Sequence, residues 1–256
     1  MNSSQKRLFG YHDLIASEQT AMQQTRSVLP GTVEFLPDLI DLFLTICLYH
    51  TGNCPEIETS EGEYHSYCSH QFGLVPYSAR AFVLLWEKGH YREGGYIIRN
   101  LLEVLVKIKY LASHKSETLQ IWSGKNRKKS LKSIFDETAP GLYQLFYGGI
   151  LSGILHGDVS ATAFRVDLVE GGKTQHIMGC QWDLKRGTIF INFFLELSAC
   201  YLLAFKAIFA KNLDFGILER VDTFLADLLN WRQGHASTWP NTKDWHFKME
   251  PLLNWI

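Results

Sequence analysis

Apolar side chains recur every three to four positions along most of this chain, which is the spacing of one face of an α-helix. From Pro37 onward, for example, Leu39, Leu42 and Ile46 fall on one side of a helix. Pro37 suits the first turn of that helix, where its missing N–H costs nothing, and Pro30 breaks the helix before it. Helices are predicted over residues 14–26, 76–88, 91–114, 142–155, 189–211 and 216–233, with Ser116 and Ser130 expected to cap short helices. The helix over 91–114 is apolar around most of its circumference, which is typical of a helix buried at the centre of a bundle.

Residues 161–182 follow a different pattern, in which apolar and polar positions alternate with a period of two, as in a β-strand. Gly171 and Gly172 lie between two such runs. Because both glycines can adopt positive φ, they favour a two-residue hairpin turn that would place Asp167 opposite His176. We therefore expect a mainly all-α fold: one multi-helix bundle over residues 1–256, with a β-hairpin inserted near 161–182.

The stretch 51–73 is rich in Gly, Ser and Glu, and it is predicted to be a long loop. It holds Cys54, His65, Cys68 and His70, and zinc takes four such ligands tetrahedrally. Regular zinc sites contain two close pairs, whereas Cys54 stands alone. Ordinary polar loop residues are therefore the simpler interpretation, and no metal or other cofactor is predicted.

The composition narrows the choice of function. A chain with 46% hydrophobic residues and a formal net charge of −1 is neither disordered nor an overall basic nucleic-acid binder, although a local basic patch is compatible with it. Five scattered cysteines without a C-x-x-C pair, and no readable signal sequence, favour a cytoplasmic protein. The apolar run 188–210 is interrupted by Asn192, Glu196 and Lys206, so a buried helix is expected there and no membrane contact. The tail 235–256 holds three tryptophans and is expected to pack on the body.

Two pairs of polar residues interrupt otherwise apolar helices. Arg99 and Glu103 lie four positions apart on one predicted helix, and Ser152 and His156 lie four apart on another, so each pair shares a helix face. Arg and Glu are seldom buried unless they are paired. We therefore expect the two polar pairs to meet in the folded protein.

A basic run lies between these helices. It consists of Lys125, Arg127, Lys128, Lys129 and Lys132. Clustered Lys and Arg neutralise phosphates, so this run is a candidate nucleic-acid-binding surface. A solvated helix face explains the same charges without any ligand.

The R-x-x-x-E helix, followed by the L-S-x-x-x-H-G element, resembles a group of uncharacterised prokaryotic helical proteins distantly similar to the HEPN superfamily. The resemblance covers roughly residues 94–158 and picks out Arg99, Glu103, Ser152 and His156. It implies a homodimeric protein of prokaryotic stress or phage defence, with RNA as its partner. It also implies metal-independent RNA cleavage by an Arg and a His through attack of the 2′-hydroxyl. The usual signature places Arg and His four to six residues apart on one helix, whereas Arg99 and His156 come from separate helices.

Two interpretations of this cluster follow. In the first, Arg99 holds a phosphate bidentately, His156 acts as a general acid or base, and Glu103 orients its partner. In the second, the four residues form a buried polar network that fixes the register of the helices in a non-enzymatic interaction or scaffold protein. The sequence contains no P-loop, dinucleotide-binding, zinc-protease or α/β-hydrolase motif, which makes those activities poor candidates.

Overall fold

The computed structural model describes residues 11–50, 58–124, 129–147, 166–169, 173–176, 182–236 and 249–255. The long helices are α1 (Tyr11–Val28), α2 (Pro30–His50), α3 (Ser60–Glu87), α4 (Tyr91–Ser113), α10 (Leu184–Phe209) and α11 (Phe215–Ala236). The shorter elements are η1 (Lys115–Glu117), α5 (Thr118–Trp122), α6 (Leu131–Thr138), α7 (Leu142–Leu145), β1 (Val166–Val169), β2 (Lys173–His176) and η3 (Ala210–Asn212). The predicted mainly helical bundle is confirmed.

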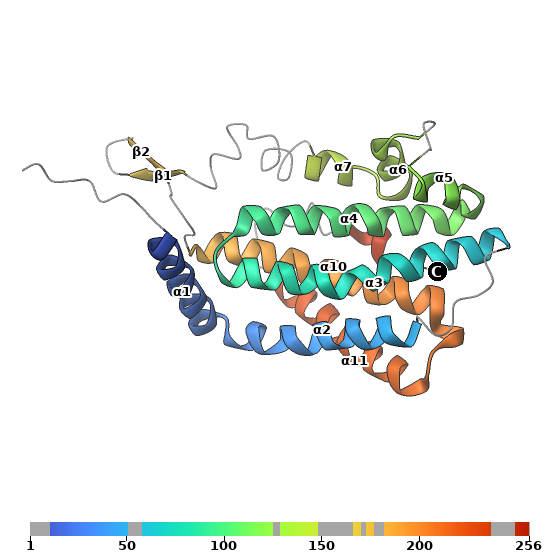
Figure 1. The fold of residues 1–256 in the computed structure, drawn as a ribbon, viewed down its shortest axis with the longest axis horizontal. Helices are drawn as coiled ribbons and strands as arrows, with labels where there is room; N and C mark the ends of the chain where they lie inside the picture. Colours follow the sequence, from blue (N-terminus) through green and yellow to red (C-terminus); the bar gives the residue numbers. More distant parts are fainter. Residues whose placement is uncertain are drawn as a thin grey trace, which may run out of the picture.

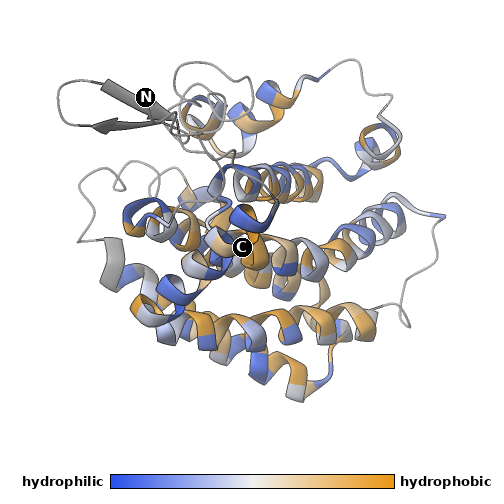
Figure 2. Cartoon of the chain, turned by 60° about the vertical axis from the view of Figure 1, so that its left-hand side comes forward, coloured by the Kyte–Doolittle hydropathy of each residue, from blue (hydrophilic) through white to orange (hydrophobic). Residues whose placement is uncertain are grey.

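The long helices lie roughly side by side, with α3, α4 and α10 in the middle, α2 and α11 on one side of them, and α5 to α7 along α4 on the other (Figure 1). Each helix mixes hydrophobic and hydrophilic residues along its length, as expected for helices with one buried face (Figure 2). The central position predicted for residues 91–114 is confirmed, because α4 packs against α3, α6 and α10.

Aromatic side chains join the central helices. Phe82 on α3 stacks on Phe194 on α10 with their ring centroids 4.5 Å apart. The indole N–H of Trp86 donates a hydrogen bond of 2.8 Å to the carbonyl oxygen of Gly187, which satisfies a polar group in the core. Gly94 allows α4 to approach α3, because a Cβ atom there would lie 3.4 Å from the Phe82 ring.

The loop predicted over 51–73 is wrong for its second half. Helix α3 begins at Ser60, with the Thr59 side chain accepting a hydrogen bond from the Gly62 N–H as an N-cap. Tyr64, Tyr67, Cys68 and Phe72 are buried at helical spacing, an apolar period that the many Gly, Ser and Glu residues obscured. Burial of this face outweighs the weak local propensity of the segment.

Both helices expected to open at a proline begin earlier than predicted. Helix α2 starts at Pro30 and contains Pro37, and α3 runs through Pro76. A proline inside a helix removes one backbone hydrogen bond, which the flanking turns and the packing of the helix must offset. Pro76 is among the buried residues of α3, so its ring contributes to that packing.

Within the predicted insertion, β1 and β2 pair antiparallel. Asp167 lies opposite Gln175 and not opposite His176, so the predicted register is wrong by one residue. Three positions, 170–172, separate the paired strands, whereas the prediction assumed a two-residue turn. The packing of a hairpin on the bundle stays a prediction, since the rest of 161–181 lies outside the described residues.

Helix α10 is, within the described part of the chain, the single helix whose length and composition would allow it to cross a membrane. In the structure 83% of its most apolar window is buried by the rest of the protein, as in the core helix of a bundle. Asn192 and Glu196 lie among its buried residues. In the tail, Met249 and Leu252 are buried and Trp255 packs against the core, whereas 237–248 lie outside the described residues.

Candidate functional site

Arg99 and Glu103 lie one turn apart on α4, as their spacing predicts. The Nε atom of Arg99 donates a hydrogen bond of 2.7 Å to Oε1 of Glu103. Their side chains are 27% and 20% exposed, so the pair is mostly buried yet reaches solvent. A ligand can therefore reach this pair. The hydrogen bond between Arg99 and Glu103 holds the pair together without a ligand.

Tyr147 is the third member of this cluster, and no pattern in the sequence indicates it. Its hydroxyl accepts a hydrogen bond of 3.2 Å from Arg99 Nε and donates one to Glu103 Oε1. The Arg99 guanidinium lies over the Tyr147 ring, 4.5 Å from its centroid, in a cation–π contact. Tyr143 stacks on Tyr147 with centroids 4.5 Å apart, which holds the ring in place.

The contacts within the cluster set the protonation states of Arg99 and Tyr147. Burial alone lowers the pKa of Arg99, but hydrogen bonds to Glu103 and Tyr147 outweigh it and leave the pKa above its ordinary value. Burial and the hydrogen bond to Glu103 raise the pKa of Tyr147. At neutral pH the site therefore consists of a guanidinium and a neutral phenol around the Glu103 side chain.

One edge of the Arg99 guanidinium is left for a ligand. Both hydrogen bonds that Arg99 makes to described residues use Nε, whereas the two terminal nitrogens have no partner among those residues. A guanidinium binds phosphate or carboxylate through two parallel N–H groups. With its plane held by Tyr147 and its Nε held by Glu103, Arg99 is suited to binding an oxyanion.

Ser152 and His156, the other two predicted site residues, lie outside the described residues. Tyr147 precedes Ser152 by five positions and contacts both Arg99 and Glu103. The chain therefore passes over the Arg99–Glu103 pair shortly before it reaches Ser152. The meeting of Arg99 with His156 stays a prediction.

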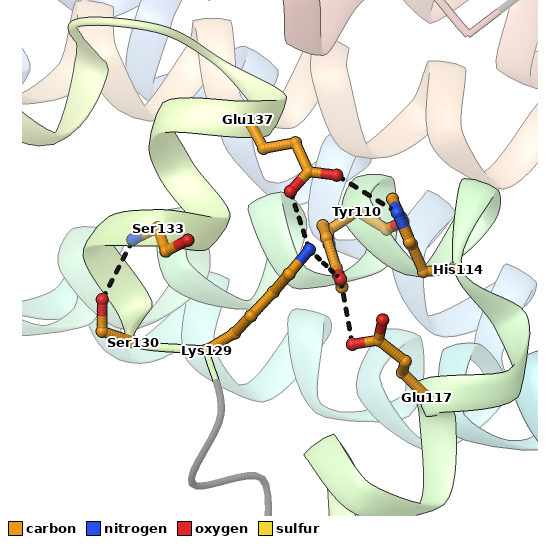
Figure 3. A network of polar contacts seen from close by, with 7 residues as sticks. All are labelled: Tyr110, His114, Glu117, Lys129, Ser130, Ser133 and Glu137. Carbon is orange, nitrogen blue, oxygen red and sulfur yellow. Dashed lines mark hydrogen bonds and ion pairs between the residues drawn. The ribbon is translucent and has the colours of Figure 1, made fainter.

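Of the predicted basic surface, Lys129 and Lys132 are described, and Lys125, Arg127 and Lys128 are not. Lys129 Nζ lies 2.8 Å from Glu137 Oε2 and donates a hydrogen bond of 2.6 Å to the Tyr110 hydroxyl (Figure 3). Lys132 Nζ lies 2.5 Å from Asp136 Oδ2. Both charges are thus partly neutralised within the protein, which weakens their attraction for phosphates.

The contacts of Lys129 belong to a network that ties α6 to the end of α4 (Figure 3). The Tyr110 hydroxyl donates a hydrogen bond of 2.9 Å to Glu117 Oε2, and His114 Nε2 lies 3.1 Å from Glu137 Oε1. The rings of Tyr110 and His114 stack with centroids 4.2 Å apart. The network therefore fixes the position of Lys129, a residue of the basic run, against α4 and α6.

The described residues contain no group of three or more His, Cys, Asp or Glu side chains that could hold a metal ion. Of the four candidate zinc ligands, Cys54 lies outside the described residues and the other three point to different surroundings on α3. His65 pairs with Glu61 at 2.9 Å, Cys68 is fully buried, and His70 packs against the Trp122 ring. Burial raises the pKa of the Cys68 thiol, so it stays protonated and is a poor metal ligand.

A pocket of about 360 Å³ lies where the start of α3 meets the ends of α4 and α10. Its charged lining includes Glu61 and Lys115, which pair with each other at 2.5 Å. Tyr64 and Trp255 supply aromatic walls. Lys211 also lines this pocket, so its charged residues are one carboxylate and two ammonium groups.

Comparisons of this sequence with models of protein families, with curated proteins and with solved structures found no match.

Proposed function

We propose that this protein is a HEPN-like helical protein of prokaryotic stress or phage defence that binds RNA at Arg99 and cleaves it without a metal ion. The observation that carries the proposal is the Arg99 guanidinium, which Glu103 and Tyr147 hold through Nε and the aromatic face while its terminal nitrogens have no partner among the described residues. A phosphodiester offers two oxygens at the spacing of those nitrogens.

In the proposed reaction, Arg99 binds the scissile phosphate and offsets the negative charge that builds up on it. His156 removes the proton of the 2′-hydroxyl, whose oxygen attacks phosphorus to form a 2′,3′-cyclic phosphate. The bond between phosphorus and the 5′-oxygen breaks, and the leaving oxygen takes up the proton that His156 accepted. Histidine suits this proton transfer because its ordinary pKa lies near neutrality. Ser152, four positions before His156 in the sequence, is proposed to orient the imidazole, and Glu103 to keep Arg99 in position.

Cleavage of a labelled single-stranded RNA by purified protein in the presence of a chelator tests this mechanism. Wild-type protein should cleave the RNA, and a substrate carrying 2′-deoxyribose throughout should stay intact. Arg99→Ala and His156→Ala should each abolish cleavage while keeping the helical circular-dichroism signal. Arg220→Ala is the matched control, because Arg220 is an exposed arginine on α11 that pairs with Asp41 at 3.0 Å.

A non-enzymatic interaction or scaffold role is the second candidate, and one observation favours it. Arg99, Glu103 and Tyr147 hydrogen-bond one another, so the cluster stabilises the bundle without any ligand. In that case Arg99→Ala would lower the melting temperature and leave RNA binding unchanged. Intact RNA after incubation with folded wild-type protein would also favour this second role over the first.

A further inference from the structure

The pocket between the start of α3 and the ends of α4 and α10 lies at one end of the bundle (Figure 1). Its volume of about 360 Å³ is within the range of roughly 300–1,000 Å³ that is usual for small-molecule sites. Ala112, which lines the pocket, lies on the same helix as Arg99 and follows it by thirteen residues, or about 20 Å along the helix axis. The pocket is therefore separate from the proposed RNA site.

Alanines at the ends of two helices leave this space open. Ala112 lies at the end of α4, Ala207 lies at the end of α10, and Ala210 begins η3. Because an alanine side chain ends at its Cβ atom, none of these three reaches across the pocket. Ala207 is exposed, so a larger side chain at this position can enter the pocket without replacing a buried residue of the core.

Two aromatic rings line the pocket, the buried Tyr64 and the partly exposed Trp255. The Tyr64 hydroxyl donates a hydrogen bond of 3.3 Å to the carbonyl oxygen of Ile108, and the Trp255 indole N–H donates one of 2.7 Å to that of Leu252. Lys109 Nζ lies 4.4 Å from the centroid of the Trp255 ring, a cation–π contact that helps to hold this ring in place. Since the polar atoms of both rings already bond within the protein, the rings offer a ligand apolar surface alone.

The charged lining of the pocket offers mainly hydrogen-bond donors. Glu61 pairs through Oε2 with Lys115 Nζ at 2.5 Å and through Oε1 with His65 Nε2 at 2.9 Å, so both carboxylate oxygens have partners. Each lysine ammonium carries three N–H groups, and Lys211 pairs with no acidic side chain among the described residues. One carboxylate and two ammonium groups give the lining a net charge of +1 when His65 is neutral. The pocket therefore favours an anion over a neutral or positively charged ligand.

We propose that this pocket binds a small organic acid in which one carboxylate is attached to a flat apolar body. The carboxylate pairs with Lys211 and with the N–H groups of Lys115 that Glu61 leaves free. The body packs against Trp255 and Ile208, which also lines the pocket. Glu61 repels a second negative charge, so a monoanion is favoured over a dianion. The proposal uses no residue of the RNA site, so it does not depend on RNA binding.

Isothermal titration calorimetry of the full chain with three compounds tests the class of ligand. 2-Naphthoate, a carboxylate on a flat apolar body, should bind to the wild type. Its neutral analogue 2-naphthamide lacks the charge, and acetate lacks the apolar body, so each should bind at least about tenfold more weakly. No binding of 2-naphthoate to folded wild-type protein, or equal affinities for 2-naphthoate and 2-naphthamide, would overturn the proposal.

Three substitutions test whether 2-naphthoate binds in this pocket. Ala207→Phe fills the pocket and should abolish binding, and Ala210→Leu replaces it if Ala207→Phe loses its helical signal. Lys211→Gln should weaken binding about three- to fivefold, as expected for a charge near the surface. Lys185→Gln is the matched control and should leave the affinity unchanged, because Lys185 is an exposed lysine at the other end of α10. Unchanged affinity in a folded pocket-filling variant would show that the acid binds elsewhere and contradict the proposal.

The indole N–H signal of Trp255 in a proton–nitrogen NMR spectrum gives a second measurement of the location. This signal is assigned by its loss in Trp255→Phe. Addition of 2-naphthoate should shift it, because the naphthalene rings change the local magnetic field at an adjacent indole. The signal of Trp86, which is 1% exposed in the core, should stay in place. A Trp255 signal that does not move while 2-naphthoate binds would contradict the proposed site.

Discussion

At Arg99, the guanidinium uses only its Nε–H group to hydrogen-bond described residues. Glu103 and Tyr147 both bind its Nε atom, and the Tyr147 ring supports the guanidinium from one face. The arrangement lowers the entropy that Arg99 would lose on binding a ligand, since its plane is already held. This orientation, more than the charge itself, distinguishes Arg99 from exposed arginines such as Arg220.

Tyr147→Phe separates the two functions of that tyrosine. The change keeps the aromatic face beneath Arg99 and removes the hydroxyl that bonds to Arg99 and Glu103. Loss of these hydrogen bonds should lower the free energy of unfolding by about 1–2 kcal/mol, measured by urea denaturation. Tyr143→Phe is the control and should change stability less, because the role of Tyr143 here is to stack on Tyr147. Equal effects of the two changes would show that the hydroxyl of Tyr147 contributes nothing specific.

Sequence reasoning found two of the three described members of this cluster. Arg99 and Glu103 stand out because they are charged residues at helical spacing in an apolar segment. Tyr147 lies 44 residues beyond Glu103, and no local pattern indicates a contact over that separation. A tyrosine in an apolar segment can pack against many different neighbours. The residue that it contacts is therefore determined by the tertiary structure and not by the local sequence.

At the scale of elements, a regular apolar period predicts the bounds of a helix, whereas an irregular period hides them. Helix 91–114 was predicted to within one residue because its apolar residues repeat without interruption. Helix α3 was missed at its start, where buried tyrosines alternate with Gly, Ser and Glu. The N-cap predicted at Ser130 is confirmed by its side-chain oxygen, which accepts a hydrogen bond from the Ser133 N–H, whereas Ser116 lies within η1.

Two glycines differ in the space around them, so replacement by valine should affect stability differently at the two positions. Gly94→Val places a branched side chain against the Phe82 ring, which is itself stacked on Phe194, and should lower the free energy of unfolding by about 2 kcal/mol. Gly31→Val on α2 has open space around it and should change stability by less than about 0.5 kcal/mol. Thermal denaturation compares the two variants directly. Similar melting temperatures would contradict the tight contact at Gly94.

At the scale of the molecule, three glutamates pair with lysines, and the pairs of Glu18 and Glu61 connect helical elements that are distant in sequence. Glu18 on α1 lies 2.9 Å from Lys88, Glu61 on α3 lies 2.5 Å from Lys115, and Glu137 on α6 lies 2.8 Å from Lys129. In each case the hydrogen bond to lysine is the largest cause that lowers the carboxyl pKa below its ordinary value of 4.5. The helices are thus joined by charge at their edges as well as by aromatic packing at their centre.

These lowered pKa values set the direction of the pH dependence. Above pH 4.5 the carboxylates are charged in both the folded and the unfolded protein, and their full contribution to stability is present. As the pH falls below 4.5, the unfolded protein takes up protons first, so the free energy of unfolding should fall. Glu18→Gln should be less stable than wild type at neutral pH, and the difference should shrink as the pH falls below 4.5 and through the lowered pKa of Glu18. A difference that stays constant across this range would contradict the assignment.

The central claim is that Arg99 holds a phosphate of RNA, and equilibrium binding tests it most directly. Fluorescence anisotropy of a labelled single-stranded RNA is measured with wild type, Arg99→Ala and Arg220→Ala, each shown to be folded. Loss of a charge-assisted contact of about 1.5–3 kcal/mol predicts a roughly tenfold or greater weakening for Arg99→Ala and no change for Arg220→Ala. Equal affinities of Arg99→Ala and wild type for the RNA would contradict the claim.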